Sequence, residues 1–158
     1  MKKKADIIPE NITLFRLKVV ESKIQSEETA QKKLNYKINV AHTVMHNLAE
    51  DRIKIGLIIE LIGEEETRET NTKAHFNIDF HYCIKELISF YNLDNNKNPI
   101  FEGILIATLL GIAFSTARGL IYERLSNTAM SGIILPIVSP QKMLVPIPNL
   151  EPPKAKNK

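Results

Sequence analysis

The sequence predicts a single α+β domain in which four antiparallel β-strands precede one long apolar helix. Two observations predict the sheet: apolar and polar residues alternate in four segments, and these segments follow one another at hairpin spacing. The third observation is an uncharged run of fifteen residues, from Gly103 to Ala117, which predicts the helix. With 158 residues, of which 44% are hydrophobic and 25% charged, the chain can bury one core.

The first two segments each predict a half-buried strand. In the first, 11–24, Phe15, Leu17 and Val19 share one face, and the apolar phase then shifts to Val20. A β-bulge or bend near Val20 would restore a single buried face. The second segment alternates more regularly, and its apolar face holds Leu34, Tyr36, Ile38, Val40 and Val44.

The third and fourth segments alternate over a longer distance. Their expected buried faces hold Ile53, Ile55, Leu57, Ile59 and Leu61 in the third, and Ala74, Phe76, Ile78, Phe80, Tyr82 and Ile84 in the fourth. Ile58 and Ile62 interrupt the polar face of the third segment. An apolar surface on the second face of a strand indicates a partner or a covering element.

The expected helix carries a stripe of small side chains at four-residue spacing. The stripe consists of Gly103, Ala107, Gly111, Ser115 and Gly119. Each glycine costs about 1 kcal/mol of helix propensity relative to alanine, so a close backbone contact should compensate. The stripe could face the chain's own sheet. Because the other faces of the helix are apolar too, and one sheet covers only one face, we expect a homo-oligomeric contact through this helix.

The same helix is expected to be buried and not to span a membrane. Fifteen uncharged residues, at about 1.5 Å each, are too short for a hydrocarbon layer of about 30 Å. Residues 92–98 predict a loop before the helix, and Pro99 suits its first turn.

After the helix, the sequence predicts extended chain. An apolar segment, 133–138, lies between Gly132 and Pro140, and six of the eight prolines lie from Pro136 onward. Proline removes amide donors and is excluded from helix interiors, so the last twenty residues should be extended and the end of the chain disordered.

The charge distribution argues against nucleic acid as a partner. The net charge is +3, and residues 1–11 and 151–158 carry all of it, so that the expected folded body is neutral. A nucleic-acid-binding domain normally has a basic stripe on its folded surface. The single cysteine, Cys83, cannot form an internal disulfide, and the N-terminal residues do not resemble a secretory signal, so we expect a cytosolic location.

No motif in the sequence predicts catalysis or a cofactor. The chain contains no nucleophile elbow, phosphate-binding loop or metal-ligand cluster of known spacing. His75, Asp79, His81 and Cys83 share the polar face of the fourth strand, but alternate strand residues lie about 6.6 Å apart, which favours a row of surface groups over a metal site. The acidic run 64–69 is interpreted as a solvated hairpin, with docking of a basic partner as the alternative.

Two fragments, together with the order of the elements, resemble the bacterial export chaperone SecB and its SecB-like relatives. They are residues 112–121, IAFSTARGLI, and residues 132–136, GIILP. In that family a helix containing Phe-Pro-Tyr-Ala-Arg is followed by a Leu-x-Pro motif. Phe114, Ala117 and Arg118 match the helix motif.

This chain departs from the family's motifs at several positions. Ser115 and Thr116 replace the family's Pro and Tyr, and Leu135-Pro136 lacks the spacer residue. The region of the family's second helix is 139–148 here, where prolines allow at most one helical turn. Export members are acidic and dock the SecA motor through an acidic surface, whereas this chain is basic overall, which argues against SecA docking.

The resemblance implies one SecB-like domain over 12–148, preceded by a basic N-terminal segment, 1–11, and followed by a disordered basic tail, 149–158. It also implies a homo-oligomer, a dimer or a tetramer built as a dimer of dimers, in which the long helices lie between sheets. Its apolar grooves would hold unfolded or extended polypeptides without ATP. The residues that could line such a groove are Ile58, Ile62, Ile133, Ile134, Leu135, Ile137, Met143 and Leu144.

Three functions are therefore expected to compete. The first is a SecB-like chaperone, for general export or for one partner such as an antitoxin. The second is an oligomeric structural or adaptor protein with the same fold. The third is a small-ligand carrier that uses the sheet and helix as a cup.

Overall fold

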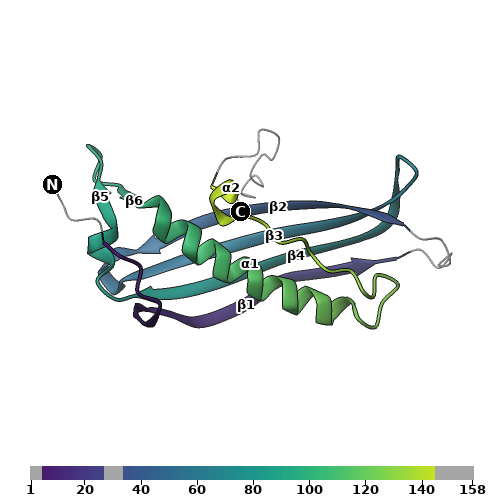
Figure 1. Cartoon of the computed structure of the whole chain (residues 1–158), viewed down its shortest axis with the longest axis horizontal. Helices are drawn as coiled ribbons and strands as arrows, with labels where there is room; N and C mark the ends of the chain where they lie inside the picture. Colours follow the sequence, from purple (N-terminus) through teal and green to yellow (C-terminus); the bar gives the residue numbers. More distant parts are fainter. Residues whose placement is uncertain (1–4, 27–33, 145–158) are drawn as a thin grey trace, which may run out of the picture.

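The computed structural model describes residues 5–26 and 34–144. Four long strands form one antiparallel sheet: β1 (Ile12–Gln25), β2 (Asn35–Asn47), β3 (Arg52–Glu65) and β4 (Arg68–Ile84). Their order across the sheet is β1-β4-β3-β2, and the long helix α1 (Gly103–Leu125) crosses one face (Figure 1). The predicted fold class, four antiparallel strands followed by one long helix, is confirmed. We call the face beneath α1 the inner face and the opposite one the outer face.

The core lies between the inner face and α1. The central strands β3 and β4 contribute Ile53, Ile55, Leu57, Ile59, Leu61, Ala74, Phe76, Ile78, Phe80, Tyr82 and Ile84, all buried. These are the residues that the alternation in the third and fourth segments predicted, so strand periodicity correctly assigned the core of the sheet.

The pairing of β1 with β4 contains two β-bulges. The register shifts between Val19 and Glu21, as the sequence predicted, and also between Leu14 and Arg16, which it did not predict. Each bulge inserts one extra residue and changes the face on which the following side chains lie.

The two inserted residues, Phe15 and Val20, are exposed. The prediction that they share the buried face with Leu17 and Val19 is wrong. Because Leu14 takes the inner position opposite Tyr82, the bulge that follows turns the ring of Phe15 to the outer face.

A small hairpin replaces the predicted loop before the helix. β5 (Tyr91–Leu93) pairs with β6 (Pro99–Phe101), after the short 3-10 turn η3 (Leu87–Phe90). The carboxylate of Asp94 accepts hydrogen bonds from the backbone amides of Asn98 and Asn96, each over 2.8 Å, and these bonds hold its pKa below the usual value. Pro99 therefore begins a strand and not the helix, a correction that agrees with the preference of proline for strand starts.

α1 is longer than the uncharged run that predicted it. It continues past Arg118 to Leu125, and its length and composition would suffice to cross a membrane. In this structure it packs over β3 and β4, where the hydroxyl of Tyr82 donates a hydrogen bond to the carbonyl of Leu109 over 3.1 Å. The helix therefore buries one side against the sheet.

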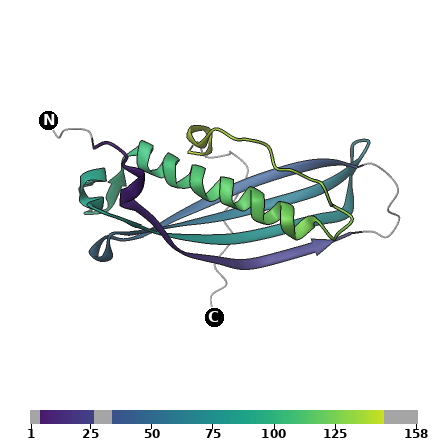
Figure 2. The ribbon, with the colours of Figure 1, turned by 60° about the horizontal axis from the view of Figure 1, so that its bottom comes forward.

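The rest of the described chain frames the helix. Residues 126–144 run back along α1 on the side away from β1 and end in the single turn α2 (Pro140–Met143) (Figures 1 and 2). The prediction of at most one helical turn in 139–148 agrees with this turn as far as Leu144, and residues 145–148 lie outside the described residues. The 3-10 turns η1 (Pro9–Asn11) and η2 (Leu48–Glu50) lie at the ends of β1 and β2, and the predicted tail 149–158 lies outside the described residues.

Candidate functional site

One side of α1 is uncharged, and no other segment among residues 5–26 and 34–144 covers it, although Thr108 is half-buried. We call it the open helix face, and it consists of Ile104, Thr108, Ile112, Ser115, Gly119 and Tyr122. Steps of three and four residues place all six on the same side of a helix. The hydroxyl of Thr108 donates to the carbonyl of Ile104 over 2.7 Å, so this polar group is satisfied within the helix. The open helix face is therefore an apolar surface available to another molecule.

An apolar cavity of 340 Å³ adjoins the open helix face on the β1 side. It is lined by Ile7, Pro9, Ile12, Leu14, Tyr82, Thr108 and Ile112. The N-terminal segment, the start of β1 and α1 form its walls, because Ile12 and Leu14 lie on the inner face opposite Ile84 and Tyr82. This cavity could hold one large apolar side chain.

On the other side of α1, the chain fills the space itself. Arg118 donates a hydrogen bond from Nε to the carbonyl of Leu135 over 2.9 Å, and Leu135 is buried. A Cβ added to Gly111 would lie 3.1 Å from Cγ of Pro140, so this part of α1 touches the segment directly. The two flanks of the helix thus differ, since one is filled and the other is open.

The structure divides the eight predicted groove residues between two faces. Ile133, Met143 and Leu144 pack against the core with Leu135, whereas Ile134 is 65% exposed and Ile137 is 86% exposed. These six residues belong to the segment that runs back along α1.

Ile58 and Ile62 lie on the outer face instead. Ile58 pairs with Ala41 and Asn77, and Ile62 pairs with Lys37 and Lys73. Because successive strand residues alternate between faces, these two residues cannot join the other six in one groove.

The predicted oligomer stripe is also divided. Ala107 is buried within the chain, and Gly103 and Gly111 lie beside Leu144 and Pro140 of the same chain. Ser115 and Gly119 are exposed, and no atom lies within 4 Å of a Cβ added to Gly119. In the second half of the stripe both small residues are therefore open to a second copy, whereas in the first half only Gly103 is exposed.

Sequence reasoning missed the cavity beside β1. Its walls include Ile7, Pro9 and Leu14, none of which was a candidate. The apolar Ile7, in a segment that was interpreted only by its charge, was the available signal, and it packs against the core.

The polar row on β4 shows ion pairing and no grouping of metal ligands. The ring nitrogens of His75 lie 3.4 Å from a carboxylate oxygen of Glu21 and 3.3 Å from one of Glu60. Within residues 5–26 and 34–144, no three His, Cys, Asp or Glu side chains are grouped so that they could hold a metal ion.

Comparison with known proteins supports the fold. No family model matches the chain, and no curated protein matches its sequence. Among solved structures, it is similar to the Mycobacterium tuberculosis SecB-like chaperone Rv1957 in complex with a ChAD peptide from the Rv1956 HigA1 antitoxin. That similarity has a TM-score of 0.57 and 13% identity, and it covers 82% of this chain and 92% of that chain. A protein of unknown function from Streptococcus agalactiae is similar with a TM-score of 0.37 and 12% identity, over 80% of this chain and 97% of that chain.

The first of these similarities identifies the class of fold. The chain has a SecB-like fold, in which a four-stranded antiparallel sheet carries one long helix.

Proposed function

We propose that this chain is an ATP-independent, chaperone-like protein that binds unfolded or extended polypeptide on the helix side of its sheet. The observation that carries the proposal is the open helix face together with the cavity of 340 Å³ beside it. The solved SecB-like chaperone that shares the fold holds a peptide, which supports the same class of ligand here.

The chemistry of the surface suits an extended apolar chain. A client side chain that enters the cavity would move out of water and pack against Ile7, Leu14 and Ile112. Each Å² of apolar area buried in this way contributes about 25 cal/mol to the binding free energy. The open helix face carries no charge that would select one sequence, so recognition rests on apolar burial. Such binding requires no nucleotide and no cofactor.

The proposal places the chain in the cytosol and covers two kinds of client. A general export chaperone would accept many unfolded chains, whereas a dedicated chaperone would hold one partner such as an antitoxin. The basic composition argues against delivery to SecA through an acidic surface. We also propose that the chain associates as a dimer or a tetramer through α1, for which Ser115 and Gly119 are the accessible members of the predicted stripe.

Light scattering of an aggregating client tests the proposal. A reduced, unfolding client should scatter less as the chain is added, with saturation near one oligomer per client. Ile112→Asp should abolish the effect, because it places a charge in the cavity wall. Ile100→Asp, at an exposed isoleucine of β6, is the matched control and should protect the client like the wild type. Undiminished scattering with the wild-type chain would rule out the chaperone function.

An oligomeric structural or adaptor protein is the second candidate, and the small residues of the open helix face favour it. If Ser115 and Gly119 pack against a second copy, the open helix face is buried in the oligomer and is not available to a client. The oligomer mass tests the self-assembly, and binding of unfolded chains distinguishes the two functions. Ser115→Glu would reduce the mass in both cases, but only in an adaptor would the wild type ignore unfolded chains and bind one native protein.

A further inference from the structure

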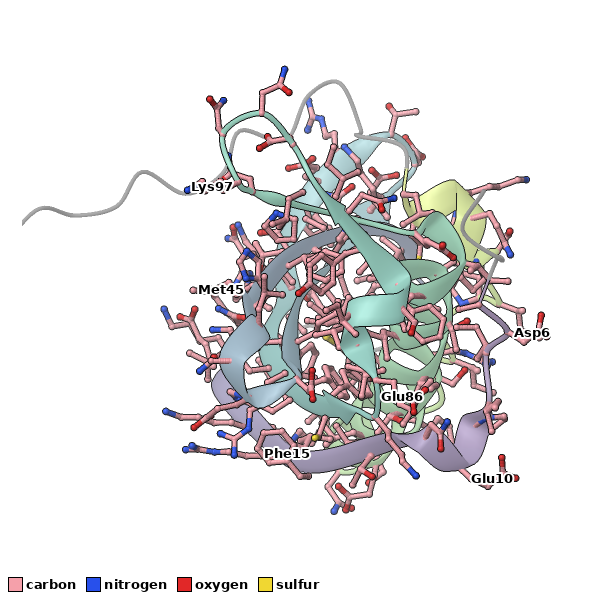
Figure 3. All side chains as sticks on the ribbon, turned by 90° about the vertical axis from the view of Figure 1, so that its left-hand side faces the viewer. Asp6, Glu10, Phe15, Met45, Glu86 and Lys97 are labelled. Atoms are coloured by element: carbon pink, nitrogen blue, oxygen red, sulfur yellow. The ribbon has the colours of Figure 1, made fainter. Side chains whose placement is uncertain are left out.

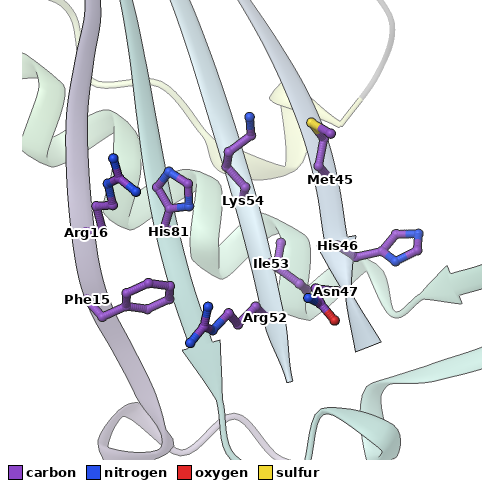
Figure 4. Close-up of a pocket in the computed structure, with 9 residues that line it drawn as sticks. All are labelled: Phe15, Arg16, Met45, His46, Asn47, Arg52, Ile53, Lys54 and His81. Atoms are coloured by element: carbon purple, nitrogen blue, oxygen red, sulfur yellow. The ribbon is translucent and has the colours of Figure 1, made fainter. Parts of the chain in front are cut away.

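A second cavity, of 380 Å³, lies on the outer face of the sheet, opposite the proposed client surface (Figure 4). All four long strands contribute to it, and its wall includes Phe15, Arg16, Met45, Arg52, Lys54 and His81. Figure 3 shows Phe15 and Met45 on the side of the sheet away from α1. The proposed function does not use this cavity.

The strand register concentrates positive charge there. Arg16 of β1 pairs with His81 of β4, which pairs with Lys54 of β3, which pairs with Met45 of β2. These four residues form one row across the sheet. The row contains no carboxylate, and its two cations, Arg16 and Lys54, lie on either side of His81.

The first β-bulge of β1 adds an aromatic surface to this charge. Because the bulge turns Phe15 outward, its ring lies 5.9 Å from that of His81, and the guanidinium of Arg52 lies 4.8 Å from its centre. Phe15 is 43% exposed and Met45 is 57% exposed. Apolar side chains therefore alternate with cations around one cavity.

Neighbouring carboxylates neutralise only part of the charge. Asp79 lies 3.5 Å from Nζ of Lys54, and Glu50 lies 2.9 Å from the guanidinium of Arg52. Across the described ranges, Arg16 has no carboxylate within salt-bridge distance. Burial and then the charge of Arg16 lower the pKa of His81, as expected for positive surroundings.

We propose that this cavity is a docking site for an acidic peptide segment of a partner protein. Carboxylates of the segment pair with Arg16 and Lys54, and an apolar side chain packs on Phe15 and Met45. The guanidinium of Arg16 presents the planar donor pair that matches a carboxylate. The chain would thus bind a client on one side of the sheet and a different, folded or tethered partner on the other.

The surroundings of the cavity favour a short acidic peptide over a nucleic acid. Farther along the outer face, Glu21 lies beside Lys23, and Glu60 lies beside His75. A phosphate backbone that continued past the cavity would meet these carboxylates, whereas nucleic-acid binding requires an extended basic stripe.

Tryptophan fluorescence gives a direct assay, because the chain contains no tryptophan. The probe is a capped pentapeptide of four glutamates around one tryptophan, at low ionic strength, where surface charges are least screened. We expect its anisotropy to rise on binding, and a peptide with glutamines in place of glutamates to bind about tenfold more weakly. Arg16→Ala and Phe15→Ala should each lower the affinity for the acidic peptide by about the same factor.

The control is Lys23→Ala, on the same strand and the same face but outside the cavity, which should leave the affinity unchanged. Circular dichroism verifies that each variant is folded. The proposal would be overturned if the glutamate and glutamine peptides bound with equal affinity. It would also be overturned if Lys23→Ala lowered the affinity for the acidic peptide as much as Arg16→Ala does. Tighter binding of a single-stranded oligonucleotide of equal charge would overturn it too. Arg16→Ala should still suppress client aggregation, so that failure of this site is distinguishable from failure of the proposed function.

Discussion

The side chain of Arg118 donates a hydrogen bond to the backbone carbonyl of Leu135 over 2.9 Å. These two residues belong to the two sequence fragments that resemble the SecB-like family, one on α1 and one in the segment that runs back along it. The contact therefore joins the two fragments in space, although the acceptor is a main-chain group that any residue at position 135 would supply. Leu135 is 1% exposed, so the bond fixes a buried part of the segment.

Arg118→Met should therefore loosen the segment 126–144. The variant keeps most of the apolar stem but removes the donor, and an unsatisfied partly buried carbonyl costs about 1–3 kcal/mol. Urea unfolding measures the loss, and faster amide hydrogen exchange at residues 133–138 locates it. Arg124→Met is the control, because this arginine of the same helix is exposed and donates only a long, exposed hydrogen bond, over 3.4 Å, to the hydroxyl of Ser22. Equal stability of the two variants would contradict a fixing role for Arg118.

The wild-type protein should lose stability at alkaline pH because of Tyr82, and Tyr82→Phe should not show this loss. Burial raises the pKa of Tyr82 well above its ordinary value, so the folded protein keeps this hydroxyl neutral. The unfolded chain releases the proton near pH 10, so the stabilisation is complete below that pH and is lost as pH rises toward the folded pKa. The difference in unfolding free energy between wild type and variant should be constant from pH 7 to about 9 and shrink above about 10.

At neutral pH, Tyr82→Phe should cost about 1 kcal/mol, because its hydroxyl loses the bond to the carbonyl of Leu109. Thermal unfolding at several pH values measures both effects. A difference that stays constant up to pH 11 would show that Tyr82 does not titrate on unfolding.

Alanine at two of the three helix glycines, Gly119 and Gly111, should have different effects. The added methyl group of Gly119→Ala meets no atom within 4 Å, and the variant gains helix propensity, so it should stabilise the chain by about 0.5–1 kcal/mol and raise Tm by about 1–4 °C. Gly111→Ala gains the same propensity, but its new Cβ would lie 3.1 Å from Cγ of Pro140, so that Pro140 must shift. This variant should be neutral or destabilising. Destabilisation by Gly119→Ala would show instead that a second copy contacts this glycine.

Gly56→Ala should destabilise the centre of the sheet. An added Cβ would lie 2.5 Å from Oγ1 of Thr43 and 3.3 Å from Oδ1 of Asp79, the residues that pair with Gly56 on either side. Overpacking of this kind costs about 1–3 kcal/mol. Thr43→Ala removes the closer atom, so the double variant should recover part of the loss in a denaturation experiment. Additive losses in the double variant would exclude the contact as the cause.

The long strands of this fold could be predicted because their alternation extends over many residues. Ile53 to Leu61 and Ala74 to Ile84 define one buried face without ambiguity. The first bulge could not be predicted, because Leu14 and Phe15 are both apolar and the sequence fits either phase. The strands of the small hairpin were missed because segments of three residues show no periodicity.

The candidate site was only partly predictable, for a different physical reason. Apolar residues after α1 could be selected by composition, but burial of Leu135 and exposure of Ile137 depend on how the segment lies against the helix. The apolar side chain of Ile7 was a local signal, but its place in the cavity wall depends on how the N-terminal segment packs against the core. The outer cavity depends on the bulge that turns Phe15 outward and was therefore missed with it.

The order β1-β4-β3-β2 leaves two long strands at the borders of the sheet, and they differ in regularity. β1 is interrupted by two bulges, whereas β2 pairs with β3 in continuous register from Asn35 to Asn47. Bulges hinder edge-to-edge association, while a long regular edge offers its free amides and carbonyls to an incoming strand. If the sheet is extended by strand addition, in assembly or in aggregation, β2 is the border on which the new strand forms.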